Sequence, residues 1–226
     1  MSMQGVKFND IHSYYDLNLI LSQCSISPAI PKTNYIEIPG ADGSIDVSEA
    51  LGEIKYKDRT GKLVFSVLPS EDFEEKKSEI SNLLNGKHFD RIILDKDPDF
   101  YYQGRCSIND WKCDKRIGQI TVDLKLHPWK LKINETVIKI SGERLQEYEF
   151  NLKNSRMPVC PVFKTKFGFD MAVKDAGEND VWYHASDNAT VKWLGVQLTE
   201  GDNFIEIYPN DPINDEITIT YQEGSL

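Results

Sequence analysis

Hydrophobic and polar residues alternate along much of this chain, and this is the pattern of half-buried β-strands. The clearest case is residues 119–126, where every second position is apolar: Ile120, Val122, Leu124 and Leu126. A second alternating run, 63–67, follows a shorter one at 53–57. We expect residues 58–61 to form the hairpin turn between these two runs.

One segment has helical spacing instead. Its apolar positions repeat at intervals of seven and four residues: Phe73, Ile80 and Leu84. Ser70 can cap the first turn through its hydroxyl, and Asn85-Gly86 can end the last turn. We therefore predict an amphipathic helix over 71–84 that covers one face of a sheet, with Lys76 on its exposed side.

Beyond residue 130 all remaining signals are strand-like. We place a domain boundary within 130–134, which divides the chain into domains 1–132 and 133–226. The sequence predicts a mainly β (α+β) fold. The first domain is expected to be an antiparallel β-sandwich with one covering helix, and the second a further β-sandwich. The helix does not alternate regularly with strands, which argues against a doubly wound parallel sheet.

The charge is unevenly placed. The 226 residues carry a formal net charge of −10, and residues 175–226 hold 11 acidic residues and one Lys. Phosphate backbones and anionic lipids need cationic surfaces, so we expect neither specific nucleic-acid binding nor attraction to a membrane. Without 18 consecutive apolar residues, no membrane insertion is expected. The acidic part can serve solubility, a docking face for a basic partner or a weak calcium site.

The sequence gives little reason to expect an enzyme or a cofactor. The four cysteines do not form a C-x-x-C pair: Cys24, Cys106, Cys113 and Cys160. No G-x-S-x-G elbow, P-loop or dinucleotide fingerprint is present. Asp97 and Asp99 flank Pro98, and we interpret them as turn residues rather than as a glycosidase pair.

An aromatic group in the second domain is a candidate glycan contact, because sugar rings stack on exposed aromatic faces. Its members are Trp182, Tyr183 and Trp193. The alternative is core packing. In a strand, Trp182 and His184 share one face while Tyr183 points to the other, so we expect one of these faces to lie in the core.

Several segments, taken in order, resemble a known family. They are the opening GVKFNDIHSYYDLNLIL (5–21), the PG-x-DG turn at 39–43, DKDPDFYYQGRCS (95–107) and GQITVDLKLHPWKL (118–131). Together they resemble the amino-terminal domain of siphophage distal tail proteins, often called Dit. The ending LTEGDNFIEIYP…DEITITYQEGSL is similar to the close of the second Dit domain, which often has a galectin-like or carbohydrate-module-like sandwich.

The resemblance implies a structural hub, not an enzyme, in a phage or prophage of a Gram-positive host. Such a protein forms a ring, a hexamer in the family, at the virion tail tip. Its partners would be the tail tube protein, the tail-tip or tail-associated lysin protein, and receptor-binding or baseplate proteins.

The amino terminus lacks a secretory signal, so synthesis and assembly are expected in the host cytoplasm. The resemblance makes five residues candidates for ring contacts: Asp42, Gly43, Tyr56, Arg59 and Arg105. The alternative function is a carbohydrate-binding module for host cell-wall glycans.

Overall fold

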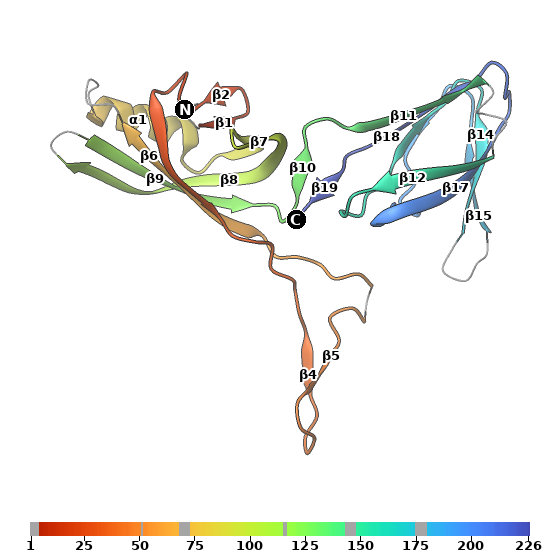
Figure 1. Cartoon of the computed structure of the whole chain (residues 1–226), viewed down its shortest axis with the longest axis horizontal. Helices are drawn as coiled ribbons and strands as arrows, with labels where there is room; N and C mark the ends of the chain where they lie inside the picture. The colour runs from red at the N-terminus through yellow and green to blue at the C-terminus, as the bar shows by residue number, and fades with distance from the viewer. Residues whose placement is uncertain (1–4, 51, 68–72, 115–116, 143–147, 175–179) are drawn as a thin grey trace. The chain divides into compact units, whose positions relative to one another are not determined.

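The computed structural model describes residues 5–50, 52–67, 73–114, 117–142, 148–174 and 180–226. By its internal contacts the chain divides into two compact units, Met1–Lys130 with Leu226, and Leu131–Ser225. All but one of the regular elements over the described residues are β-strands (Figure 1), which confirms the predicted mainly β fold.

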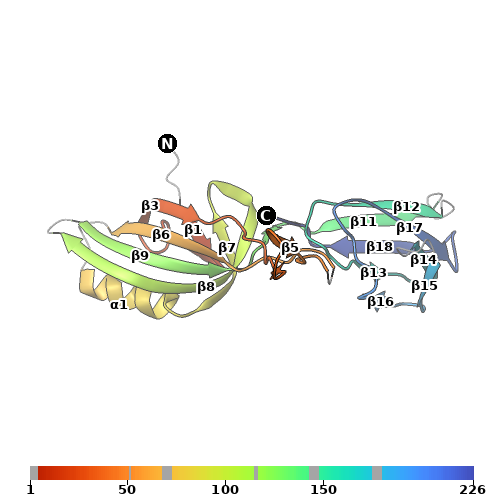
Figure 2. The same ribbon diagram turned by 90° about the horizontal axis from the view of Figure 1, so that it is seen from below.

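The amino-terminal unit is built on one antiparallel sheet with the strand order β2-β1-β7-β8-β9-β6-β3. Figure 2 shows its long strands side by side, with α1 (Phe73–Leu84) along the sheet. The strands are β1 (Val6–Phe8), β2 (Ile11–His12), β3 (Leu19–Ile26), β6 (Arg59–Val67), β7 (His88–Leu94), β8 (Asp97–Asp114) and β9 (Ile117–Leu126).

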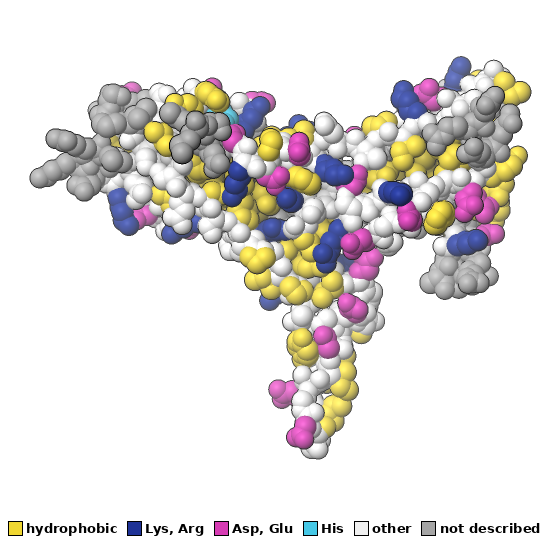
Figure 3. Space-filling model, viewed as in Figure 1, with side chains coloured by type: hydrophobic (Ala, Val, Ile, Leu, Met, Phe, Trp, Pro, Cys, Tyr) yellow, Lys and Arg dark blue, Asp and Glu magenta, His cyan; other side chains and the backbone are white. Residues whose placement is uncertain are grey.

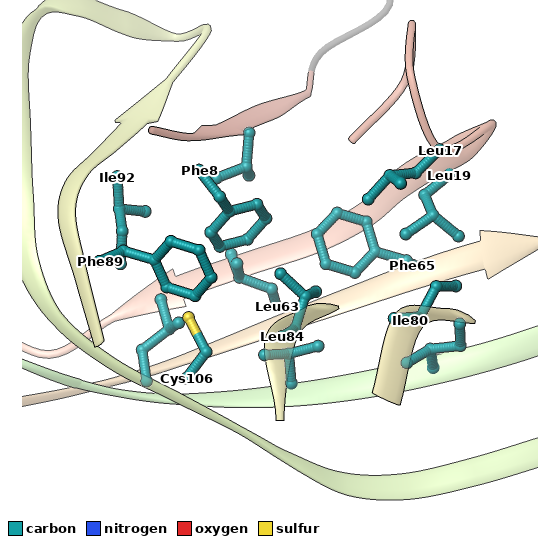
Figure 4. Packing of buried hydrophobic residues seen from close by; sticks show 14 of the residues in the cluster. Phe8, Leu17, Leu19, Leu63, Phe65, Ile80, Leu84, Phe89, Ile92 and Cys106 are labelled. Carbon is teal, nitrogen blue, oxygen red and sulfur yellow. The ribbon is translucent and has the colours of Figure 1, made fainter. Parts of the chain in front are cut away.

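The core of this unit joins the helix to distant strands. Figure 4 shows Phe8 of β1 facing Phe65 of β6, with Ile80 and Leu84 of α1 packed beneath them. The alternation in β9 is confirmed, since its four predicted apolar residues are at most 2 % exposed: Ile120, Val122, Leu124 and Leu126.

The helix prediction is confirmed for the described residues. Ile80 and Leu84 are fully buried, and Gly86 ends the helix with a φ of 73°. The proposed cap, Ser70, lies outside the described residues. Lys76 was wrongly expected on the exposed face: its side chain is buried, and its Nζ reaches Glu79 Oε2 at 2.8 Å. A long aliphatic stem can cover the core while its amine stays near water.

The predicted turn at 58–61 is wrong. Arg59 and Gly61 lie inside β6, where Gly61 pairs with Ile26 on one side and Leu124 on the other. A Cβ on Gly61 would lie 3.2 Å from the Leu124 side chain. The glycine therefore allows close strand packing, and the hairpin turn lies earlier, between β4 (Tyr35–Glu37) and β5 (Ser44–Asp46).

The carboxy-terminal unit is a sandwich of two four-stranded antiparallel sheets. One sheet has the order β11 (Thr136–Ser141), β18 (Glu216–Tyr221), β13 (Val162–Lys164) and β16 (Thr190–Val191). The other has the order β12 (Glu149–Asn154), β17 (Gly201–Pro209), β14 (Phe169–Lys174) and β15 (Asp180–Ala185). Ile217 and Ile219 of the first sheet share one core with Ile205 and Ile207 of the second. The short strands β10 (Lys130–Lys132) and β19 (Gly224–Ser225) pair with each other.

Candidate functional site

Residues 27–58, which we call the arm, leave the sheet of the amino-terminal unit between β3 and β6. Figure 1 shows the arm reaching away from that sheet and ending in the hairpin β4–β5. Gly40 and Gly43 have φ values of 84° and 78°, a region that favours glycine. The turn dipeptides of the sequence therefore shape the tip of the arm.

One face of this hairpin is apolar and exposed. Ile36 and Ile45 lie directly opposite each other, each 52 % exposed, and the nearby Ile38 is 45 % exposed. Figure 3 shows hydrophobic side chains along the arm next to acidic ones. None of the described arm residues belongs to either hydrophobic core. Since a lone two-stranded hairpin is marginally stable in water, this surface is suited to a partner.

Side-chain hydrogen bonds hold the hairpin in register at its open end. Asp46 Oδ1 accepts from the Ser48 hydroxyl at 2.5 Å and from the Ser48 amide at 2.9 Å. These bonds hold the pKa of Asp46 below its usual value. The Ser48 hydroxyl also accepts from the amide of Asn34 at 2.8 Å. The arm is therefore organised locally, although its apolar face has no core to cover it.

The five candidate ring residues fall in different places. Asp42 and Gly43 are exposed at the tip of the arm, and Tyr56 lies at its base, where its ring meets Trp129 edge-on at 5.4 Å. Arg59 is 6 % exposed, and its Nε donates to the Pro128 carbonyl at 2.6 Å. The Arg59 side chain therefore packs inside its own subunit.

Arg105 lines an open pocket of about 280 Å³ in the amino-terminal unit. Its guanidinium is exposed and donates to the Gly86 carbonyl. In the same pocket, Asp58 at the end of the arm forms an ion pair with Lys125 at 3.4 Å. A Cβ on the neighbouring Gly104 would lie 2.2 Å from the Lys125 carbonyl oxygen, so this position of β8 requires glycine for its close approach to β9.

The structure separates the three candidate glycan residues. Tyr183 and Trp193 pack against each other at 5.3 Å and against the core of the carboxy-terminal unit. Trp182 points to the opposite side of β15 and is 57 % exposed. Of this group, Trp182 is the most exposed, whereas Tyr183 and Trp193 are partly buried.

Two further aromatic residues lie beside Trp182, and the sequence analysis missed both. Tyr208 of β17 lies 5.4 Å from Trp182 and 5.1 Å from Tyr148, measured between ring centroids. We call Trp182, Tyr208 and Tyr148 the aromatic row. The alternation of β17, in which Phe204, Glu206 and Tyr208 share one face, could have revealed Tyr208. Tyr148 precedes β12, and no sequence signal marks its position.

The described residues offer little for metal chemistry. Among them, no group of three or more His, Cys, Asp or Glu side chains is placed to hold a metal ion. Their four thiols are unpaired, and burial raises the pKa of Cys106 to about 12. Asp97 and Asp99 are not turn residues, because the turn falls at 95–96 and β8 begins at Asp97. Asp97 instead pairs with Lys130 at 2.8 Å.

Within the described part of the chain, no helix is long and apolar enough to cross a lipid bilayer.

Comparison with known proteins shows that solved structures share this architecture. No family model matches the sequence, and no curated protein is significantly similar to it. Among solved structures, the crystal structure of the SPP1 Dit protein (gp 19.1) superposes with a TM-score of 0.70. The match covers 99 % of both chains at 14 % sequence identity. The chain has the Dit fold.

The resemblance seen in the ordered sequence segments is thereby confirmed at the level of the fold. SPP1 Dit is described as a paradigm of the hub adsorption apparatus in phages that infect Gram-positive bacteria. The superposition includes both units of this chain, since it covers nearly its full length. At this identity the match establishes the Dit-like architecture, and function has to be argued from the surfaces described above.

Proposed function

We propose that this protein is a structural hub of a phage tail tip that assembles into a closed ring, a hexamer by analogy with its family. Domain 1–132 would form the ring, and domain 133–226 would face outward. The proposed role is structural, and exposed binding surfaces are the features on which it is argued. The Dit fold over the whole chain supports this proposal.

The exposed arm is the observation that supports ring assembly most directly. A single subunit leaves the apolar face of Ile36, Ile38 and Ile45 in water. In a ring, the arm of each subunit can contact a second, different surface on the next subunit. Such head-to-tail contacts form a closed ring when the rotation from one subunit to the next is a whole fraction of a full turn. Arg105 and the pocket around it form an exposed surface of the same unit that is a candidate for the receiving side.

The ring would connect the tail tube to the tail-tip or tail-associated lysin protein and to receptor-binding or baseplate proteins. Its lumen would let DNA pass without holding it. The charge is compatible with this role, because residues 1–174 carry 25 basic and 25 acidic residues and so have no net positive charge. The protein would be assembled in the host cytoplasm and reside at the virion tail tip.

Light scattering after size exclusion, over a range of protein concentrations, tests the proposal. A hexamer has six times the mass of one 25.9 kDa chain, about 155 kDa. Negative-stain images of that peak should show a central hole. The double variant Ile36→Asp, Ile45→Asp should elute as a monomer with unchanged circular dichroism, because neither side chain belongs to a core.

Ile213→Asp is the matched control. Ile213 is 76 % exposed in the carboxy-terminal unit, so the same chemical change there should leave the ring intact. A wild-type monomer at every concentration would contradict self-assembly. A ring that survives the double arm substitution would contradict the assigned contact.

A further inference from the structure

The outer face of the sheet β12-β17-β14-β15 exposes large apolar side chains although it covers no core. Trp182 on β15 is 57 % exposed, Phe204 on β17 is 58 % exposed, and Tyr148, just before β12, is 54 % exposed. Single exposed apolar residues are common, but a group of them on one face of a sheet typically marks an interaction surface. This face is therefore a candidate docking surface of the carboxy-terminal unit.

The aromatic row forms one ridge on this face, because its rings lie against one another. Tyr208 is in the middle, with its ring centroid 5.4 Å from Trp182 and 5.1 Å from Tyr148. The Tyr208 hydroxyl donates to Glu206 Oε2 at 2.5 Å, and the Tyr148 carbonyl accepts from the Ile207 amide at 2.8 Å. The ridge is thus ordered in the free subunit, so its side chains lose little conformational entropy when a partner packs against them. Ordered Trp and Tyr side chains commonly dominate the binding energy of protein–protein interfaces.

Two carboxylates beside the ridge lack a compensating charge. The register of β12 and β17 places Glu149 directly opposite Glu206, and like charges at such positions destabilise a sheet. Asp202 on the same face has a partner, since it pairs with Lys153 at 3.6 Å. Within the described part of the chain, neither Glu149 nor Glu206 forms an ion pair. A cation brought by a partner would therefore relieve this repulsion.

Aromatic rings and unpaired carboxylates together favour a cationic protein segment. The guanidinium of Arg can stack on an aromatic ring and can also bind a carboxylate through two hydrogen bonds. Trp182 and Glu206 lie in register on either side of the short Ala172, so one Arg side chain can approach both. A second copy of this chain is disfavoured as the partner, because residues 175–226 hold 11 acidic residues and one Lys.

We propose that this face docks a basic segment of a different protein, in which Arg lies beside apolar residues. The Arg side chain would bind Glu149 and Glu206 and stack on Trp182, while its apolar neighbours pack on the rest of the aromatic row. The inference rests on the proposed hub role and deepens it, because it assigns a partner chemistry to the outward domain.

Synthetic peptides test the docking surface on the intact protein. A library of dodecapeptides that combine Arg with Leu, Val and Ser should contain a binder, whose affinity is then measured by calorimetry. Citrulline in place of Arg keeps the shape of the side chain and removes its charge. The citrulline peptide should bind about tenfold more weakly, because it loses two exposed ion pairs and one cation–π contact.

Three substitutions locate the binding site. Trp182→Ala should weaken peptide binding about tenfold or more, because it removes an exposed aromatic anchor. Glu149→Gln and Glu206→Gln should each weaken it about two- to fivefold. Glu135→Gln is the matched control, because Glu135 is exposed next to β11 of the other sheet and loses the same charge. Its affinity should equal that of the wild type.

The free protein offers a second readout that needs no peptide. Since Glu149 repels Glu206, Glu149→Gln should not lower the Tm, whereas a carboxylate that serves the fold would lower it on removal. A fall in the Tm of Glu149→Gln would contradict the inference, because it would show that this carboxylate stabilises the sheet.

Three binding results would overturn the inference: no peptide bound at millimolar concentration, equal binding of the citrulline peptide, and binding that Trp182→Ala leaves unchanged. Assembly that is lost in Trp182→Ala would assign the face to a second copy instead. Light scattering on the same samples separates this inference from the proposed ring. A ring that binds no peptide refutes only the docking surface, and a monomer that binds the peptide refutes only the ring.

Discussion

The carboxylate of Asp215 connects two parts of the carboxy-terminal sandwich, and its removal should destabilise that unit strongly. Asp215 is 2 % exposed, and its Oδ2 accepts from the buried Thr165 hydroxyl at 2.7 Å. Its Oδ1 accepts from three backbone amides at 2.9 to 3.3 Å: Lys166, Phe167 and Glu216. One side chain therefore ties the turn between β13 and β14 to the start of β18.

Asp215→Ala leaves all four donors without this acceptor. A hydrogen bond to a charged group contributes about 1.5–3 kcal/mol. Water can replace the carboxylate at the partly buried amides. We therefore count the buried Thr165 hydrogen bond as lost in full, and the three amide hydrogen bonds together as the loss of one more. The expected loss is about 3–6 kcal/mol. For a unit of this size, that corresponds to a fall in Tm of roughly 12 °C or more.

Differential scanning calorimetry of the intact chain measures this loss, and hydrogen exchange locates it at residues 166–168. Asp211→Ala is the matched control, because Asp211 accepts from the amides of Ile213 and Asn214 but belongs to an exposed local turn. Its Tm should change little. Asp215→Asn keeps one acceptor oxygen and should fall between the two. Equal shifts for Asp215→Ala and Asp211→Ala would refute the reasoning.

Two further predictions concern titratable groups. Burial alone would raise the pKa of Glu223, but hydrogen bonds from three partners outweigh it and lower that pKa: Ser155, Thr136 and Lys132. The stabilisation by Glu223 is therefore complete above its ordinary pKa of 4.5 and is lost as the pH falls through the lowered value. In Glu223→Gln, the free energy of unfolding should depend less on pH below pH 4.5 than in the wild type. An unchanged pH dependence in that range would contradict this prediction. In thiol labelling at pH 8, the exposed Cys113 should react at once and the buried Cys106 only after unfolding, and rapid labelling of Cys106 in the native protein would show that its site opens.

Local patterns predicted the parts of this fold that depend on local spacing. The alternation over 119–126 identified the buried face of β9, because each apolar position faces the same core. The spacing of Ile80 and Leu84 identified the packed face of α1 for the same reason. The turn at 39–43 was also evident, since Gly40 and Gly43 supply the positive φ values that it needs.

The remaining features depend on contacts between distant residues. A glycine can form a turn or admit a neighbouring strand, and at Gly61 only the register with β3 and β9 decides between them. Tyr208 and Trp182 lie 26 residues apart, and pairing of β14 with both of their strands brings them together. Asp215 is adjacent to the acidic Glu216, and only the fold distinguishes the buried carboxylate from the surface one.

The arm also has a consequence for the behaviour of the single subunit in solution. A single subunit offers two unpaired strand edges with isoleucines on one face, a surface that invites aggregation at high protein concentration. Glu37, Asp42 and Asp46 place like charges along that hairpin, so two arms repel each other. Salt weakens this repulsion by screening. The charges on the arm thus oppose association of two subunits through their hairpins, and raising the ionic strength should increase that association.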